Sequence, residues 1–108
     1  MMHKKKVAVV GLGVMGSHHA RILDSFNVLD AVCDPDQNRA HAKGKQYEVR
    51  WHTDLDTMLR ELQLNAVCIA APTPYHLEVG ERCLQAGLDV FMEKPLAVDP
   101  VGVRSIIS

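Results

Sequence analysis

The sequence has no marked excess of charge of either sign and few aromatic residues. Its 12 lysines and arginines nearly balance 13 aspartates and glutamates, the net charge is −1, and aromatic residues make up 5% of the chain. A nucleic-acid-binding domain needs a clustered basic surface, often with aromatic side chains on which bases stack. The basic run at residues 4–6 lies at the start of the chain, where we expect it to be solvated. The composition therefore gives no reason to expect nucleic acid as a partner.

Long hydrophobic runs are missing as well. A membrane-spanning helix needs about 20 consecutive apolar residues, and the apolar runs of this chain, such as residues 66–71, are far shorter. The lysines at 4–6 are followed by a short apolar run that ends at a glycine, which does not match a signal peptide. We therefore expect a soluble cytoplasmic protein that does not associate with membranes.

Cysteine is scarce too. Cys33, Cys68 and Cys83 are odd in number, have no CxxC spacing, and each lie in an apolar stretch. This pattern favours buried, reduced thiols over disulfide partners or metal ligands. His18 and His19 are adjacent, so they cannot share one helix face, and neither has a partner at metal-ligand spacing. We expect no metal site.

What the sequence does contain is an alternation of short apolar runs with segments of helical periodicity. We predict strands over residues 7–10, 28–33, 49–51, 66–71 and 90–92. We predict helices over residues 15–23, 35–45 and 75–86, a further helix whose apolar residues are Leu55, Met58, Leu59 and Leu62, and the start of another at Asp99–Pro100. Strands that alternate with helices form a parallel sheet through right-handed crossovers. The predicted fold class is therefore α/β, a doubly wound parallel sheet of about five strands.

Two of these helices invite more specific predictions. Thr53 is a candidate N-cap, because an acidic residue, Asp56, follows three positions later. The helix over 35–45 is polar and contains Gly44, so we expect it to be short or frayed.

The whole chain, residues 1–108, is predicted to form one domain. The last helix has apolar residues to bury, yet the chain stops at Ser108. A doubly wound nucleotide-binding fold normally continues into a sixth strand. We therefore expect these residues to be the front of a longer protein.

A glycine-rich loop follows the first predicted strand and opens the first predicted helix. Its spacing, GLGVMG, matches the GxGxxG fingerprint of dinucleotide-binding proteins. Gly11 would allow a tight turn, Gly13 would let a pyrophosphate approach the backbone, and Gly16 would let helix and strand pack closely. Amides at the helix start would hold the anion. The candidate cofactor-binding residues here are Gly11, Leu12, Gly13, Val14, Met15 and Gly16.

An acidic residue is expected about 20 positions further on, where it accepts hydrogen bonds from the adenosine ribose. Asp34 closes the second predicted strand and meets this requirement. Its carboxylate would repel a 2′-phosphate, so NAD is favoured over NADP, although Arg39 is near enough in sequence to soften that preference. One alternative is that Asp34 only caps the following helix. Others are that the loop is a structural turn or binds S-adenosylmethionine, as in methyltransferases.

Three further stretches suggest a family. They are His19-Ala20-Arg21, the segment Ala71-Pro72-Thr73-Pro74-Tyr75-His76 after the fourth strand, and Glu93-Lys94-Pro95 after the fifth. With the glycine loop, they make the whole chain resemble the N-terminal domain of the Gfo/Idh/MocA oxidoreductases. The resemblance implies a Rossmann domain followed by a larger α/β domain. That second domain would provide much of the substrate site, the general acid/base and the interface of a homo-oligomer.

The resemblance also implies roles for individual residues. Lys94 would be catalytic, lying beside the nicotinamide and the hydroxyl of a sugar, nucleotide sugar or polyol substrate. Glu93 would help to hold the nicotinamide half of the cofactor. Ala71, Pro72, Thr73 and His76 would lie along the diphosphate and the nicotinamide ribose. For His76 the alternative is that it only satisfies nearby backbone groups. For the whole chain, the alternative is a non-catalytic NAD-sensing or regulatory module.

Overall fold

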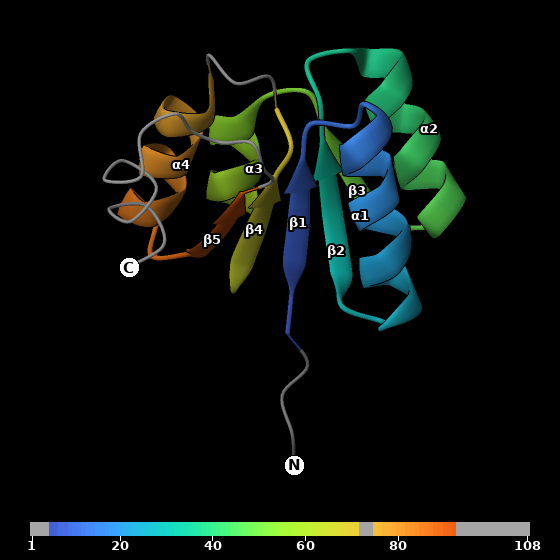
Figure 1. Cartoon of the computed structure of the whole chain (residues 1–108), viewed down its shortest axis with the longest axis horizontal. Helices are drawn as coiled ribbons and strands as arrows, with labels where there is room; N and C mark the ends of the chain where they lie inside the picture. The colour runs from blue at the N-terminus through green and yellow to red at the C-terminus, as the bar shows by residue number, and fades with distance from the viewer. Residues whose placement is uncertain (1–4, 72–74, 93–108) are drawn as a thin grey trace.

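The computed structural model describes residues 5–71 and 75–92, which form a five-stranded parallel sheet with helices on both faces (Figure 1). The strands are β1 (Val7–Val10), β2 (Leu29–Cys33), β3 (Arg50–His52), β4 (Ala66–Ile69) and β5 (Asp89–Met92). The helices are α1 (Val14–Ser25), α2 (Gln37–Tyr47), α3 (Leu55–Glu61) and α4 (His76–Gln85). The strand order is β3-β2-β1-β4-β5, and every neighbouring pair is parallel. This is the predicted doubly wound α/β fold.

The order of the strands creates a crevice at the carboxyl edge of the sheet. The chain moves outward from β1 through β2 to β3, then returns to the other side of β1 with β4 and β5. Connections on the two sides of β1 therefore leave in opposite directions, and ligands of open α/β sheets bind at such a reversal. In Figure 1 the strand arrows point to this edge, away from the N-terminus.

Each face of the sheet has its own core. The alternation of side chains along the strands sends one set towards α3 and α4, where the buried members are Ala8, Val10, Ala31, Cys33, Val67, Ile69 and Val90, packed with Met58, Cys83 and Leu88. The other set faces α1 and α2 and comprises Val9, Val32 and their buried neighbours Leu12, Ala20 and Ala40. Strand β1 is buried on both faces and β4 nearly so, with only Cys68 half-buried, so both sequences are continuous apolar runs.

The prediction that helix 35–45 is short or frayed is wrong. Helix α2 has 11 residues, and Asp36 caps its start by accepting hydrogen bonds from the amides of Asn38 and Arg39. A larger residue would not fit at position 44, because a Cβ there would lie 2.7 Å from the side chain of Trp51. The glycine is what allows β3 to pack against α2.

The N-cap of α3 also differs from the prediction. Asp54, not Thr53, caps this helix, and its carboxylate accepts hydrogen bonds from both the amide and the hydroxyl of Thr57. These bonds, led by the one from the hydroxyl, lower the pKa of Asp54. Both residue types are good N-caps, so the sequence alone does not choose between neighbours.

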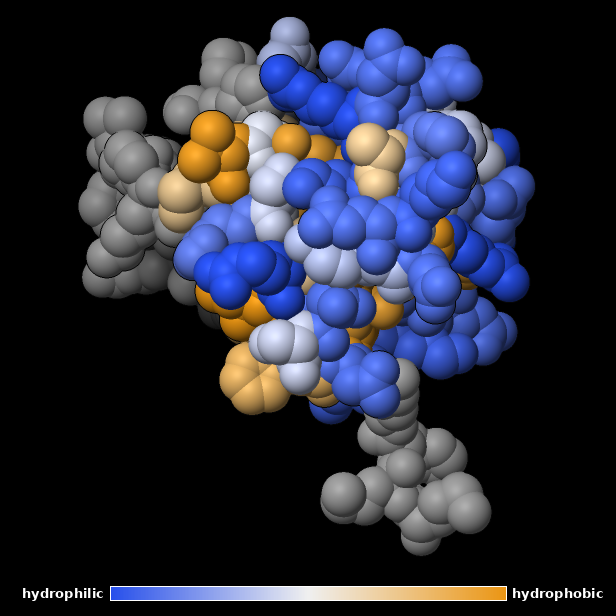
Figure 2. Space-filling view, turned by 90° about the vertical axis from the view of Figure 1, so that its right-hand side faces the viewer, coloured by the Kyte–Doolittle hydropathy of each residue, from blue (hydrophilic) through white to orange (hydrophobic). Residues whose placement is uncertain are grey.

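Among the described residues, no helix combines the length and apolar character needed to cross a bilayer. Figure 2 shows that hydrophilic residues cover most of the face on the side of α1 and α2.

Candidate cofactor-binding site

The glycine loop brings the start of α1 against the end of β1. Gly11 has φ +95°, a conformation that favours glycine, and its N–H donates to the Cys33 carbonyl at 2.8 Å. A Cβ at Gly16 would lie 1.6 Å from the Gly11 carbonyl oxygen, and a Cβ at Gly11 would lie 2.7 Å from the backbone of Ala70. Backbone therefore packs directly on backbone at two points, as the spacing of the glycines predicts.

Gly13 differs from these two glycines. Its φ is −70°, which any residue adopts, and, apart from Gly13 and its two chain neighbours, no heavy atom of the described residues lies within 4 Å of a Cβ built there. It is also the N-cap of α1, and no side chain in the described part of the molecule caps that helix. Packing within the protein does not require a glycine here. The free space lies instead beside helix amides that are suited to an anion, which fits a cofactor diphosphate.

Asp34 lies at the end of β2 and points into the glycine loop. The side chain is buried, with an exposed fraction of 6% for the residue. Its Oδ2 accepts the Leu12 N–H at 2.7 Å and its Oδ1 accepts the Asp36 N–H at 2.8 Å. Each oxygen keeps one further acceptor position. The alternative that Asp34 caps the next helix is wrong, because Asp36 is the cap of α2.

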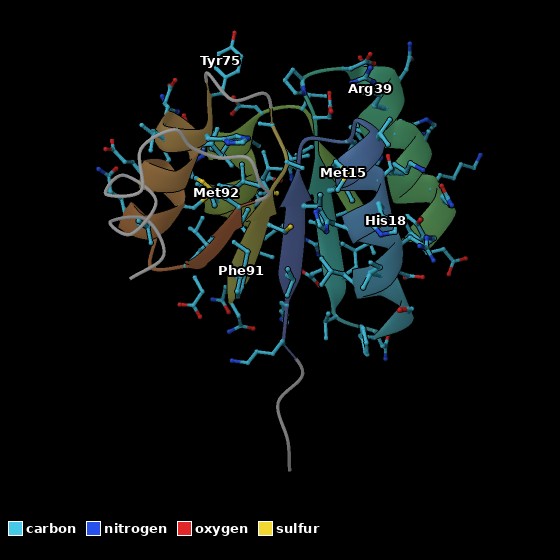
Figure 3. All side chains as sticks on the ribbon, viewed as in Figure 1. Met15, His18, Arg39, Tyr75, Phe91 and Met92 are labelled. Atoms are coloured by element: carbon cyan, nitrogen blue, oxygen red, sulfur yellow. The ribbon has the colours of Figure 1, made fainter. Side chains whose placement is uncertain are left out.

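A cavity of about 510 Å³ opens beside Asp34 at the carboxyl edge. Its lining comes from the ends of β1, β2 and β4 and from α2, α3 and α4: Val10, Gly11, Cys33, Asp34, Pro35, Arg39, Leu55, Ala71, Tyr75, Glu78, Val79 and Arg82. Of the residues predicted for the site, Gly11, Asp34, Arg39 and Ala71 meet here. In Figure 3, Arg39 and Tyr75 project from this edge on the two sides of the sheet.

The wall formed by α4 was not predicted from the sequence. Arg82 on this wall bonds Asp56 at 2.6 Å and Glu78 at 3.3 Å. The hydrogen bond with Asp56 is the main cause that raises the pKa of Arg82 further. Glu78 and Arg82 have the i,i+4 spacing of a helical ion pair, which the sequence does show. The contact with Asp56 joins α3 to α4 and has no sequence signal.

His76 is buried and is the first residue of α4. Its Nε2–H donates to the Ala71 carbonyl, so the histidine does satisfy a nearby backbone group. Its Nδ1 is buried without a hydrogen-bond partner within residues 5–71 and 75–92. A contact between His76 and a cofactor stays a prediction.

The cysteines differ in burial. Cys33 and Cys83 are buried free thiols, as predicted, whereas Cys68 is only half-buried. Desolvation by burial, followed by the charge of Asp34, raises the pKa of Cys33 to about 12, and burial raises the pKa of Cys83 to about 11. Both thiols therefore stay protonated and unreactive at neutral pH. No group of three or more potential metal ligands occurs among the residues that the structure describes.

Several predicted site residues lie outside the described residues. These are Pro72 and Thr73 after β4, and Glu93 and Lys94 after β5. Their neighbours Ala71 and Met92 are the last described positions before each gap.

A parallel sheet with a glycine loop at β1, a buried acid at the end of β2 and a cavity at the strand-order reversal defines a dinucleotide-binding domain of the Rossmann type. The chain belongs to the Gfo/Idh/MocA family, whose model, described as an oxidoreductase family with an NAD-binding Rossmann fold, matches residues 5–108. The resemblance inferred from the sequence motifs is thereby confirmed.

Individual relatives are dehydrogenases of polyols and nucleotide sugars. The chain is 34% identical to inositol 2-dehydrogenase 1 of Saccharopolyspora erythraea, a match that covers 95% of this chain and 32% of that protein. It is 32% identical to UDP-N-acetylglucosamine 3-dehydrogenase of Acidithiobacillus ferrooxidans, covering 99% and 33%. The fold also matches scyllo-inositol dehydrogenase of Lactobacillus casei, solved with NAD(H) and scyllo-inositol, with a TM-score of 0.83, 28% identity, and coverage of 96% and 32%. The chain thus spans about a third of the length of these relatives.

Proposed function

We propose that this chain binds NAD along the carboxyl edge of its sheet, and that the protein it belongs to oxidises or reduces a secondary alcohol of a sugar, nucleotide sugar or polyol. The observation that supports this most directly is the buried carboxylate of Asp34, which lies between the glycine loop and a cavity of about 510 Å³. The names of the relatives support the substrate class. In the whole protein, a second domain would complete the substrate site and form a homo-oligomer.

The diphosphate would lie over the start of α1. The amides of Val14 and Met15 follow a glycine that leaves open space, and the helix macrodipole favours an anion there. The ribose of the adenosine half would lie against Asp34, whose free acceptor positions suit two hydroxyl donors.

The same carboxylate favours NAD over NADP. A 2′-phosphate at this point would place negative charge against a buried anion, which is strongly unfavourable at low dielectric. Arg39 would offset part of this repulsion, but its guanidinium already lies 3.9 Å from the carboxylate of Asp36. NADP is therefore the weaker ligand of the two.

The chemistry would take place after β5. When bound, the cofactor supplies a nicotinamide ring that accepts or returns a hydride. The ammonium of Lys94 stabilises the negative charge that develops on the substrate oxygen. A lysine at its ordinary pKa is a poor base near neutrality, so the proton of the hydroxyl would go to a group in the second domain. The 108 residues by themselves would accordingly bind the cofactor without turnover.

Calorimetric titration of this chain with NADH, NADPH and S-adenosylmethionine tests the proposal. We expect binding of NADH, weaker binding of NADPH and none of S-adenosylmethionine. Binding of S-adenosylmethionine alone would favour a methyltransferase instead. A non-catalytic NAD-sensing module would bind NADH in the same way, but substitution of Lys94 in the whole protein would not alter its output.

A further inference from the structure

The peptide groups on both sides of Leu12 are held by side chains from two different elements. The Leu12 N–H donates to Asp34 Oδ2 at 2.7 Å, and the Leu12 carbonyl accepts the hydroxyl of Ser17 at 3.1 Å. Asp34 lies at the end of β2 and Ser17 in the first turns of α1. The side chain of Leu12 is itself buried, with an exposed fraction of 3%.

These contacts hold Leu12, which lies between Gly11 and the start of α1. Gly11 and Gly16 are positioned by backbone packing on either side of it. Beyond Leu12 the chain turns outward, and Val14 is 88% exposed. The direction of the amides that follow Gly13 therefore depends on how firmly Leu12 is held.

We propose that Asp34 and Ser17 form a clamp on Leu12 that sets the glycine loop for a diphosphate before the ligand arrives. In this account Asp34 is a positioning residue for the loop in addition to its proposed role as a ribose acceptor. The inference rests on the proposed function, since it concerns the same cofactor site. If the clamp exists, replacing Asp34 by a neutral residue in order to admit NADP also lowers the affinity of the glycine loop for the diphosphate.

Two ligands distinguish the role of Asp34 in positioning the loop from its role as a ribose acceptor. ADP carries a diphosphate and both ribose hydroxyls, whereas 2′,3′-dideoxy-ADP carries the same adenine and diphosphate without those hydroxyls. We would measure the affinity of both ligands by calorimetry for the unaltered chain, Asp34→Asn and Ser17→Ala. Asp30→Asn is the matched control, because it makes the same carboxylate-to-amide change at the other end of β2.

The clamp predicts that both site variants bind the dideoxy ligand more weakly. Asp34→Asn keeps one acceptor oxygen for the N–H groups of Leu12 and Asp36, so the hold on the loop is weakened and we expect a loss of about tenfold. Ser17→Ala removes a hydrogen bond at a carbonyl, and a loss of about threefold is expected for both ligands alike. For ADP, Asp34→Asn should lose additional affinity, because the variant also lacks an acceptor for the ribose hydroxyls. Asp30→Asn should bind both ligands with the affinity of the unaltered chain.

Affinities are expressed per folded molecule from urea unfolding of each variant, so that a loss of stability does not count as a loss of binding. Slow hydrogen exchange of the Leu12 amide in the unaltered chain is a second readout that needs no variant. The clamp is overturned if the dideoxy ligand binds both site variants unchanged, or if the Leu12 amide exchanges as fast as that of Val14. If the unaltered chain binds neither ligand, the result contradicts the proposed function and therefore also the clamp.

Discussion

The molecule has two halves, each made of one face of the sheet with the helices that cover it, and the two halves are packed in different ways. On the side of α1, backbone packs on backbone, with Gly16 directly against the Gly11 carbonyl. On the side of α3 and α4, large side chains fill the space, and Met58, Ile69 and Cys83 are fully buried. The close approach in the first half places the start of α1, with its helix amides, at the carboxyl edge of the sheet. The second half provides most of the bulky core, so binding and stability depend on different residues.

Met58→Ala tests the second half and should have the largest effect on stability. The side chain lies fully buried in the core beneath α3, so its removal leaves a cavity. We expect the free energy of unfolding to fall by about 2–5 kcal/mol, measured by urea denaturation. The affinity of the remaining folded molecules for NADH should not change. A loss of affinity as large as the loss of stability would show that the halves are not separate.

Gly16→Ala tests the first half. The new Cβ would overlap the Gly11 carbonyl, at 1.6 Å from its oxygen, and neither backbone segment can move without disturbing β1. We expect a loss of about 3 kcal/mol in the free energy of unfolding, together with weaker NADH binding by the folded molecules. Urea denaturation and calorimetry measure the two effects. Unchanged stability would contradict the packing described for the loop.

Gly13→Ala is the matched control for that change, since it adds the same methyl group to the same loop. Apart from the residue itself and its two chain neighbours, no described atom lies within 4 Å of the new Cβ, and φ is −70°. Stability should therefore stay within about 0.5 kcal/mol. The methyl group would occupy the proposed diphosphate position, so NADH should bind about tenfold more weakly. Equal NADH affinity would place the diphosphate elsewhere.

The last prediction is confined to alkaline pH and concerns the two buried thiols. The pKa of Cys33 is about 12 and that of Cys83 about 11 in the folded chain, above the ordinary 9.0. The unfolded chain therefore releases these protons at lower pH than the folded chain does. Their contribution to stability is complete below pH 9.0 and is lost as the pH rises towards the folded values.

Urea unfolding across this pH range measures the loss. The double variant Cys33→Ala/Cys83→Ala removes both thiols and should show a shallower decline of stability between about pH 9 and about pH 11. An identical decline in the two proteins would mean that other groups determine it.

The sequence predicts features that arise within one β-α-β unit, but not contacts between elements that are distant in the chain. Element types were predictable because β1 and β4 are continuous apolar runs and the helices have clear periodicity. Asp34 was predictable because its distance from the glycines is set by one β-α-β unit. Gly44 was misinterpreted because its reason is Trp51, a tertiary contact with β3. The ion pair of Arg82 with Asp56, 26 positions away, was missed for the same reason.

The central claim is that NAD binds at the glycine loop, and NMR of the chain titrated with NADH tests it most directly. We predict shifts of the amides of residues 11–16 and of Asp34, with little change in the hollow at the other edge of the sheet, which includes Lys6, Asp30 and Arg50. Shifts confined to that hollow, or no shifts in the glycine loop at saturating NADH, would contradict the account.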